Sequence, residues 1–371
     1  MDTGRGVLTR RELNRALLAR QMLLGRVSIS PLETVRRLVA LQAQVVSPPH
    51  IGLWTRLESY RREDLCALLV EKEVVRATLL RSTLHLMSAR DYLAFRRPLQ
   101  AALTRSSATI TGKRLAGLDL ERLVEAARVR FENEPCTFAE LRETLAEVEP
   151  ERNPSALAYA VRTHLPLVQT PTGEAWGYSS RPPYALAEAW LGQTPDPDEG
   201  AHEMIRRYLA AFGPASVMDF QVWSGLTRMK PTFEELRPEL RTFRDEGGRK
   251  LFDLPDAPLP DADTPAPPRF VPDYDNLVLS HADRSRIIAA ESRKFVFLSA
   301  ARVRATILVD GFVAGTWKVE EKRGEAVLTV EPFRGLPAEA RDALSEEGDR
   351  LIRFLRERAK AHHVRFEESS G

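Results

Sequence analysis

A chain of 371 residues is long for one hydrophobic core and predicts two or three compact units. Its composition, 43% hydrophobic and 29% charged, is that of a globular protein, and no apolar run reaches the roughly 18 residues that a membrane span needs. The N-terminus lacks the apolar stretch of a secretory signal. Two cysteines, Cys66 and Cys136, are too few for a disulfide framework or a zinc site. We therefore expect a cytoplasmic protein with no metal and no other cofactor.

The net charge of +2 hides an asymmetry along the chain. Residues 1–130 hold 23 Lys and Arg against 12 Asp and Glu, whereas the remainder holds 31 against 40. A basic third is what a polyanion-binding surface needs. Arginine-rich helices that are merely solvated give the same count, so charge alone leaves both interpretations open.

The first third of the chain predicts helices followed by a hairpin. Apolar residues recur at helical spacing over residues 11–24, and Ser30 with Pro31 has the pattern of an N-cap and a first helical residue. Two further helices are predicted over residues 49–72. Residues 74–88 are β-branched and alternating, which predicts a hairpin. Short helices followed by a hairpin are typical of a winged helix, a relative of the helix-turn-helix.

The same order of helices and a hairpin recurs twice, without obvious sequence identity. Residues 137–179 predict two helices and a hairpin that turns at Thr172-Gly173. Residues 202–254 predict three helices and a hairpin that turns at Gly247-Gly248. These repeats predict three tandem winged-helix units, with boundaries at residues 1–105, 106–195 and 196–260.

The last part of the chain predicts a different unit over residues 261–371. It opens with a connection rich in proline and aspartate, which is not a helix. Short strands follow, with a hairpin turn at Asp310-Gly311, and they suggest a small sheet or barrel. A helix from about Pro337 to His362 is predicted to close the chain. The fold class is therefore α+β.

Gln42-Ala43-Gln44 lies between a helical run and the proline pair that starts at Pro48. The helix that begins at Pro31 must end before Pro48, because the residue before a proline avoids the helical region. In an extended segment, residues two apart share one face, so both amides can point into one cleft. A glutamine offers one acceptor and two donors but no useful pKa, so it can position water without acting as a strong base. The alternative is that the two amides only cap the end of the helix.

Five segments resemble a known family, and they occur in the order that the family shows. They are "LVALQAQ", "VVRATLLRSTLHLMSARDY", "RYLAAFGPASVMDFQVWSGL", "VPDYDNLVLSHADRSRII" and "ATILVDGFVAGTWKVE". Together they resemble the winged-helix DNA glycosylases typified by AlkZ, which include the related YcaQ-type enzymes. Each segment is weak by itself, whereas the ordered set is specific and spans about residues 8–360.

The resemblance implies three tandem winged-helix units and a C-terminal β-barrel, arranged as a C-shaped cleft for DNA. It implies a catalytic Gln-x-Gln motif, here Gln42 and Gln44, where the YcaQ type has Gln-x-Asp. It also implies removal of N7-alkylated purines, and in some members the unhooking of interstrand crosslinks. A monomer acting on double-stranded DNA is expected.

Five further residues are predicted to contact DNA. In the first hairpin, Thr83 and His85 share a face, and Arg81 lies at the turn. Arg76 and Arg284 complete the set. A structural, hydrogen-bonded histidine is the alternative for His85.

The fourth resembling segment contains two aspartates, Asp275 and Asp283, and Asp283 is next to Arg284. They belong to the family-like pattern, so a position in the cleft is one interpretation. A buried Asp–Arg brace is the interpretation we favour.

The chemistry suits two uncharged amides. N7-alkylguanine already carries a positive charge, so it leaves without a strong general acid, and the protein has to position water and stabilise the sugar. We therefore predict a monofunctional DNA glycosylase of base excision repair that acts on cationic alkylpurines. The alternative is a non-catalytic winged-helix DNA-binding protein or transcriptional regulator.

Overall fold

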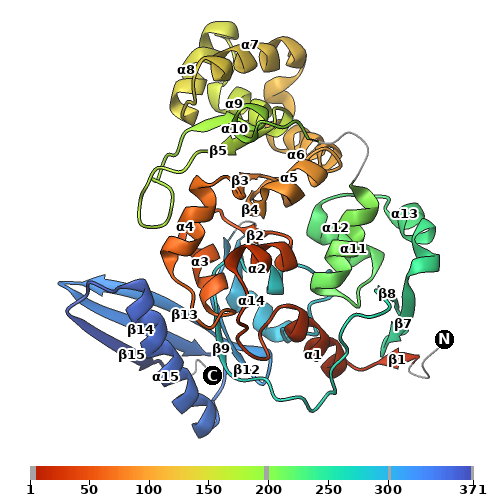
Figure 1. The fold of residues 1–371 in the computed structure, drawn as a ribbon, viewed down its shortest axis with the longest axis vertical. Helices are drawn as coiled ribbons and strands as arrows, with labels where there is room; N and C mark the ends of the chain where they lie inside the picture. The colour runs from red at the N-terminus through yellow and green to blue at the C-terminus, as the bar shows by residue number, and fades with distance from the viewer. Residues whose placement is uncertain (1–5, 196–199, 300–301, 369–371) are drawn as a thin grey trace.

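The computed structural model describes residues 6–195, 200–299 and 302–368. Its fold is mixed α+β, as predicted, with helices and strands interleaved along the chain (Figure 1). Within these ranges no helix is both long and apolar enough to cross a membrane.

The first group of elements carries the glutamine pair. Its elements are β1 (Val7–Leu8), α1 (Arg10–Arg20), α2 (Pro31–Leu38), β2 (Leu41–Gln42), α3 (Ser47–Trp54), α4 (Arg62–Val70), β3 (Val74–Thr78), β4 (Leu84–Ser88) and α5 (Ala89–Phe95). The predicted start of α2 is confirmed, because the Ser30 side chain accepts a hydrogen bond from the backbone N–H of Glu33 and Pro31 follows it. The predicted hairpin over residues 74–88 is also confirmed, since β3 and β4 pair antiparallel.

The second group lies at one end of the molecule, at the top of Figure 1. Its elements are α6 (Gln100–Thr111), α7 (Leu120–Asn133), α8 (Phe138–Val148), α9 (Pro154–His164), β5 (Leu167–Gln169), β6 (Tyr184–Leu186) and α10 (Ala187–Leu191). Its strands extend the hairpin of the first group into one five-stranded sheet of order β2-β4-β3-β5-β6. The junction is the antiparallel pair β3–β5, in which Arg76 lies opposite Gln169.

The hairpin turn predicted at Thr172-Gly173 is wrong. β5 pairs with β6 over residues 184–186, and a long loop over residues 170–183 connects the two strands. This loop packs against α4, where a Cβ on Gly177 would lie 2.7 Å from Leu69 Cδ1. The turn residues are present in the sequence, but this docking onto another group is a non-local contact that they do not encode.

The third group contains α11 (Ala201–Phe212), α12 (Val217–Ser224), α13 (Lys230–Glu235), β7 (Arg241–Asp245) and β8 (Lys250–Asp253). β7 and β8 form the hairpin predicted to turn at Gly247-Gly248. β1, from the start of the chain, pairs parallel with β7 and completes a three-stranded sheet.

The C-terminal group is built on a five-stranded sheet of order β15-β14-β13-β12-β9. Its elements are β9 (Arg269–Val271), α14 (Arg293–Val296), β10 (Phe297–Ser299), β11 (Arg302–Val303), β12 (Thr306–Val309), β13 (Phe312–Lys322), β14 (Glu325–Pro332), α15 (Ala338–Leu355) and β15 (Ala361–Phe366). The hairpin between β12 and β13 confirms the predicted turn at Asp310-Gly311.

Two predictions for this group need correction. The described strands form an open sheet and not a closed barrel, because β9 and β15 each pair with one neighbour only and α15 packs across the sheet. The closing helix ends at Leu355, short of the predicted His362, and residues 361–366 pair parallel with β14. Both errors concern pairing between distant segments, which local periodicity does not determine.

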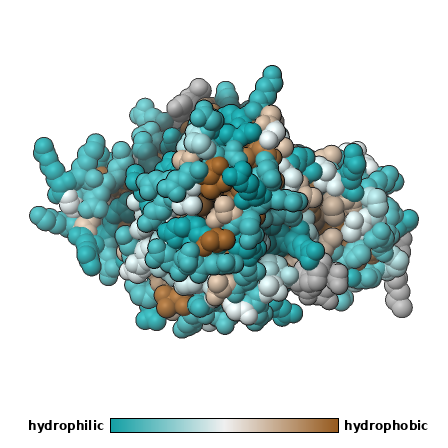
Figure 2. All heavy atoms as spheres, turned by 90° about the horizontal axis from the view of Figure 1, so that it is seen from above, coloured by the Kyte–Doolittle hydropathy of each residue, from teal (hydrophilic) through white to brown (hydrophobic). Residues whose placement is uncertain are grey.

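The hydrophobic core is divided unequally among the groups. The largest cluster joins residues of every group, among them Leu17, Tyr208, Trp223 and Ile288. The helices of the second group have a separate core of their own. Seen from above, the surface is mostly hydrophilic with small apolar areas (Figure 2). The boundaries at residues 105, 195 and 260, and the tandem winged-helix arrangement, stay predictions.

Two buried arginine–aspartate pairs connect the groups. Arg20 of α1 lies 2.7 Å from Asp253 of β8, and the side chains of both are buried. Arg56 lies 3.0 Å from Asp275 and contacts it through two nitrogens. Removing one partner of such a pair leaves a buried charge unpaired, which typically costs about 3–5 kcal/mol.

Three buried histidines, His50, His85 and His281, make the stability of the fold depend on pH. His281 Nε2–H donates to the carbonyl of Phe212, and its Nδ1 is buried with no partner among the described residues. Burial lowers the pKa of His281 to about 3 and that of His50 to about 4. The unfolded chain therefore binds more protons than the folded chain between about pH 6.5 and 4.

We predict that the free energy of unfolding falls as the pH is lowered through this window, by about 1.4 kcal/mol per pH unit for each histidine. Urea denaturation at a series of pH values measures this slope. His281→Gln keeps a donor for the Phe212 carbonyl and should lower the slope of unfolding free energy against pH by about 1.4 kcal/mol per pH unit. His363→Gln, at an exposed histidine, is the control. An unchanged slope in His281→Gln would contradict the assignment.

Candidate active site

The glutamine segment is an extended connection between two helices. α2 ends at Leu38, the chain turns through Val39 with a φ of 66°, and β2 then pairs with β4. Gln42 lies opposite His85 in that pairing, and the backbone N–H of Ala43 donates to the carbonyl of Leu84 at 2.7 Å. The predicted switch from helix to extended chain is therefore confirmed, and the first hairpin holds the segment.

The amide of Gln42 has a defined orientation. Its Oε1 accepts a hydrogen bond of 2.9 Å from Arg81 Nη2. An arginine can only donate, so the amide atom facing it must be the oxygen. Gln42 is 9% exposed, and its Nε2 has no hydrogen-bond partner in the described parts of the chain. The NH₂ group is thus available for a ligand.

Gln44 lies in a more open position. Its Oε1 accepts a hydrogen bond of 3.2 Å from the backbone N–H of Leu84, which again fixes which atom is the oxygen. The residue is exposed and lines a cavity of about 680 Å³ between the first and second groups. Gln42 is not part of this lining. The two amides therefore stand on one segment, but only Gln44 borders the cavity.

Arg76 holds the backbone between the two glutamines. Its Nε and Nη2 donate to the carbonyl of Ala43 at 2.9 and 2.7 Å. Its guanidinium stacks over Tyr178, 5.0 Å from the ring centre, and burial lowers its pKa. Arg76 is 4% exposed, so in this structure it faces the protein and positions the segment. Its predicted contact with DNA stays a prediction that this geometry does not favour.

Arg81 is the hub of the polar cluster around Gln42. Its Nη1 donates to the carbonyl of Trp223 at 2.7 Å, and its Nη2 also reaches Asn276 Oδ1 at 3.2 Å. Burial and the charge on Arg284 lower the pKa of Arg81 to about 10, so it stays protonated at neutral pH. The guanidinium points into the cluster, where it orients Gln42. The predicted role on a phosphate is therefore not what the side chain does here.

His85 is a neutral, buried member of the same cluster. Its Nδ1 lies 3.1 Å from the carbonyl of Thr83 and must carry the proton, since a carbonyl only accepts. Its Nε2 is then the acceptor that faces Arg81 Nη2 at 3.4 Å. Burial and the charge of Arg81 lower the pKa of His85 to about 3. The Thr83 hydroxyl donates to the carbonyl of Leu80. His85 is fully buried and cannot contact DNA in this structure, whereas Thr83 is half-buried and its predicted contact stays a prediction.

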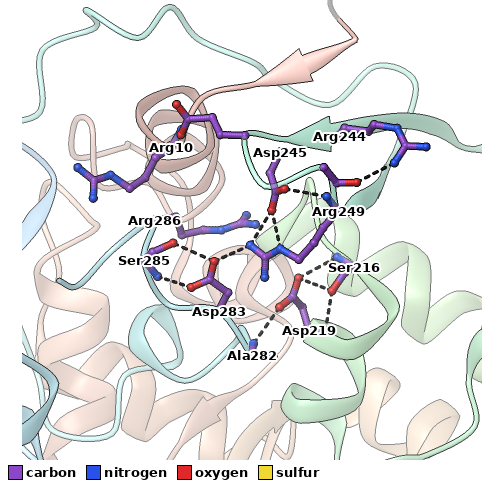
Figure 3. A network of polar contacts seen from close by, with 12 residues as sticks. Arg10, Ser216, Asp219, Arg244, Asp245, Arg249, Ala282, Asp283, Ser285 and Arg286 are labelled. Carbon is purple, nitrogen blue, oxygen red and sulfur yellow. Dashed lines mark hydrogen bonds and ion pairs between the residues drawn. The ribbon is translucent and has the colours of Figure 1, made fainter. Parts of the chain in front are cut away.

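The aspartates of the fourth resembling segment act mainly as braces. Asp275 binds the buried Arg56, and Asp283 binds Arg249, which also holds Asp245 (Figure 3). The favoured interpretation of a buried Asp–Arg brace matches the Asp275 pair only, because the side chains of Asp283 and Arg249 are 31% and 46% exposed. Arg284 is half-buried, stacks over Phe297 at 4.4 Å and lies close enough to Arg81 to affect its pKa.

One contributor to the site was missed by the sequence analysis. Asn276 accepts from Arg81 and donates through Nδ2 to the carbonyl of Ala40 at 2.8 Å. It thereby connects the turn Asn276–Val278 to the residue before β2. Asn276 stands inside one of the five resembling segments, so the motif held the signal, but no spacing rule singles out one asparagine.

Comparisons with known proteins point in one direction. The model of a family described as "DNA glycosylase AlkZ-like" matches residues 35–354. A relative described as "Interstrand DNA cross-link repair glycosylase" from Streptomyces sahachiroi is 26% identical over 338 residues, which cover 85% of this chain and 88% of the relative. The solved structure "Streptomyces sahachiroi DNA glycosylase AlkZ" superposes with a TM-score of 0.76 at 22% identity, over 97% of this chain and 100% of that one. At that identity the superposition shows a shared fold.

Proposed function

The chain belongs to the AlkZ-like DNA glycosylase family, and from that premise we propose that it hydrolyses the N-glycosidic bond of cationic alkylated purines in DNA, with N7-alkylguanine as the type substrate. Membership in a glycosylase family favours the enzyme over the non-catalytic regulator that the sequence left open. The observation that carries the proposal is the fixed amide of Gln42, oriented by Arg81, on the same short segment as the exposed Gln44.

The substrate class follows from what these residues can do. Gln42, Gln44 and the neutral His85 supply no strong acid at neutral pH, so the site suits a base that leaves without protonation. A purine alkylated at N7 is such a base, because its positive charge is neutralised when the glycosidic bond breaks. An unmodified purine would need a proton that this cluster does not provide.

We assign the two glutamines complementary roles. Gln44 is exposed and keeps one acceptor lone pair and two N–H donors, so it holds the attacking water next to the sugar. Gln42 is held from behind by Arg81 and donates its free N–H groups toward the same water or a sugar oxygen. Fixed dipoles of this kind accelerate a reaction because they need no reorganisation in the transition state.

We extend the proposal to interstrand crosslinks, which the printed name of the Streptomyces relative specifies for that protein. In a crosslink that joins two N7 positions, one guanine on each strand is alkylated at N7. Each of the two guanines is therefore the same kind of cationic leaving group as N7-methylguanine. We further propose a cytoplasmic monomer in which tandem winged-helix units form a C-shaped surface around the duplex.

The direct test is excision from an oligonucleotide duplex that carries one N7-methylguanine, followed by alkaline cleavage of abasic sites. We predict strand breaks with the wild-type protein, and a loss of rate on the order of 10²-fold or more in Gln42→Ala and in Gln44→Ala. The exposed Gln193 is a matched control, since Gln193→Ala removes the same group outside the site.

Binding without breaks by the wild-type protein would support the non-catalytic alternative. Equal rates for Gln193→Ala and the two site variants would show that the amides carry no chemistry. A duplex with a crosslink joining two N7 positions, assayed in the same way, separates crosslink repair from repair of single adducts.

The reaction should also be insensitive to pH. Neither glutamine titrates, His85 stays neutral above its pKa of about 3, and Arg81 stays protonated below its pKa of about 10. We predict a flat profile of single-turnover rate against pH between about 5 and 9. A bell-shaped profile with a limb near the ordinary histidine pKa of about 6.5 would contradict this site.

A further inference from the structure

The cavity beside Gln44 has the composition of a binding site. Its volume is about 680 Å³, and it lies where the glutamine segment meets α8, α9 and the loop 170–183. Aromatic rings form part of its wall, namely those of Phe138, Trp176, Tyr178 and Tyr184. In Figure 1 the loop that follows β5 descends beside α4, so the cavity is closed by contacts between two groups of elements.

The lining is strongly cationic. The lining contains four arginines and one carboxylate, namely Arg76, Arg142, Arg162, Arg181 and Glu174. In residues 6–195, 200–299 and 302–368, none of these arginines forms an ion pair, although most buried arginines elsewhere in the protein do. Arg142 and Arg181 are exposed. The lining therefore carries an excess of positive charge, with one carboxylate for four arginines.

Stacking holds two of these guanidinium groups in place. Arg162 lies over Tyr159 at 4.7 Å and over Phe138 at 5.6 Å, and Arg76 lies over Tyr178 at 5.0 Å. Contact with an aromatic face orients a guanidinium but does not neutralise it. Such a planar fork of N–H donors matches the oxygens of a phosphate.

Two buried polar atoms in the lining also lack a partner. Gln169 is 4% exposed; its Nε2 donates to the Tyr184 hydroxyl at 2.7 Å, and its Oε1 has no partner in the described chain. The Nε of Arg162 is likewise buried without a partner. Unpaired buried polar groups are rare and indicate a missing partner, such as a ligand or an ordered water.

The cavity is rigid on its loop side. Gly177 has a φ of 83°, and a side chain there would collide with Leu69. The carbonyl of Trp176 accepts from His50 Nε2, and His50 Nδ1 accepts from the Tyr60 hydroxyl. These contacts attach the loop that carries Arg181 to α3 and α4.

We propose that this cavity binds a phosphodiester of the damaged strand next to the lesion, and so places the sugar against Gln44. The inference rests on the proposed function. A cationic alkylpurine would be repelled by a lining of four arginines and one carboxylate, whereas the phosphate beside it is attracted. The cavity is therefore a backbone site and not a pocket for an extruded base. Arg162 and Arg181 are its principal contacts, and Gln44 connects it to the reacting sugar.

The test measures binding to a duplex that contains a tetrahydrofuran abasic analogue, which cannot react, at salt concentrations between about 50 and 200 mM. We expect Arg162→Gln and Arg181→Gln each to weaken binding about tenfold and to lower the slope of log K against log salt by about 1. Arg162→Lys should keep the slope, because the charge remains. Arg122→Gln, an exposed arginine of α7 outside the cavity, is the control.

A neutral methylphosphonate locates the contact. Placed at the phosphate that the cavity holds, it should lower the slope for the wild-type protein and have no further effect in Arg162→Gln. If Arg162→Gln does not fold, as judged by circular dichroism, the exposed Arg181→Gln gives the same measurement.

The inference would be overturned if Arg162→Gln and Arg181→Gln both keep the wild-type affinity and the wild-type slope of log K against log salt. A second result would also overturn it. If the salt slope of both variants is unchanged and the wild-type protein excises a bulky N7 adduct more slowly than N7-methylguanine, the cavity holds the base or its adduct. The proposed function fails separately: a wild-type protein without excision, whose arginine variants still show the reduced slope, has the phosphate site but not the activity.

Discussion

The hydrogen bond from Arg81 to Gln42 is the contact on which the rest of the site depends. Arg81 stands in the turn between β3 and β4 with a φ of 53°, and the same guanidinium reaches Trp223 on α12 and Asn276. One side chain therefore connects three groups of elements at the Gln42 amide. Removing a cation from water is costly, and among the described residues four acceptors and no carboxylate contact the Arg81 guanidinium. Because Arg81 can only donate, it also determines that the oxygen of the Gln42 amide faces the guanidinium and that the NH₂ group points away from it.

The arginines around the site fall into two classes. Arg20 and Arg56 are neutralised by buried aspartates and hold the groups of elements together. The arginines beside Gln44, such as Arg162 and Arg181, have no carboxylate partner among the described residues. The arginines of the protein are thus divided between structure and the surface that we assign to DNA, and Arg162 and Arg181 lie outside the basic first third of the sequence. Charge counting alone could not separate these uses.

Local signals in the sequence predicted local structure well. The N-cap at Ser30, the first hairpin and the turns at Gly247-Gly248 and Asp310-Gly311 all appear as expected, because each depends on a few adjacent residues. The barrel and the end of the last helix were wrong, because each depends on which distant strand pairs with which.

The candidate site shows the same division. The motif located Gln42 and Gln44, and the extended backbone that carries them was predicted from Pro48. The sequence could not show that Arg76 and Arg81 turn inward to hold this segment, or that His85 is neutral and buried. Nor could it place the loop 170–183 against α4, which is what forms the cavity beside Gln44. These features depend on packing between groups far apart in the chain.

The most direct test of this account is a double-mutant cycle between Arg81 and Gln42, measured as single-turnover excision of N7-methylguanine. If Arg81 acts through Gln42, the double variant Arg81→Ala, Gln42→Ala should be no slower than Gln42→Ala alone. Thermal melting of each variant controls for loss of fold. Losses of rate that multiply in the double variant would contradict the account, because they would show that the two residues act independently.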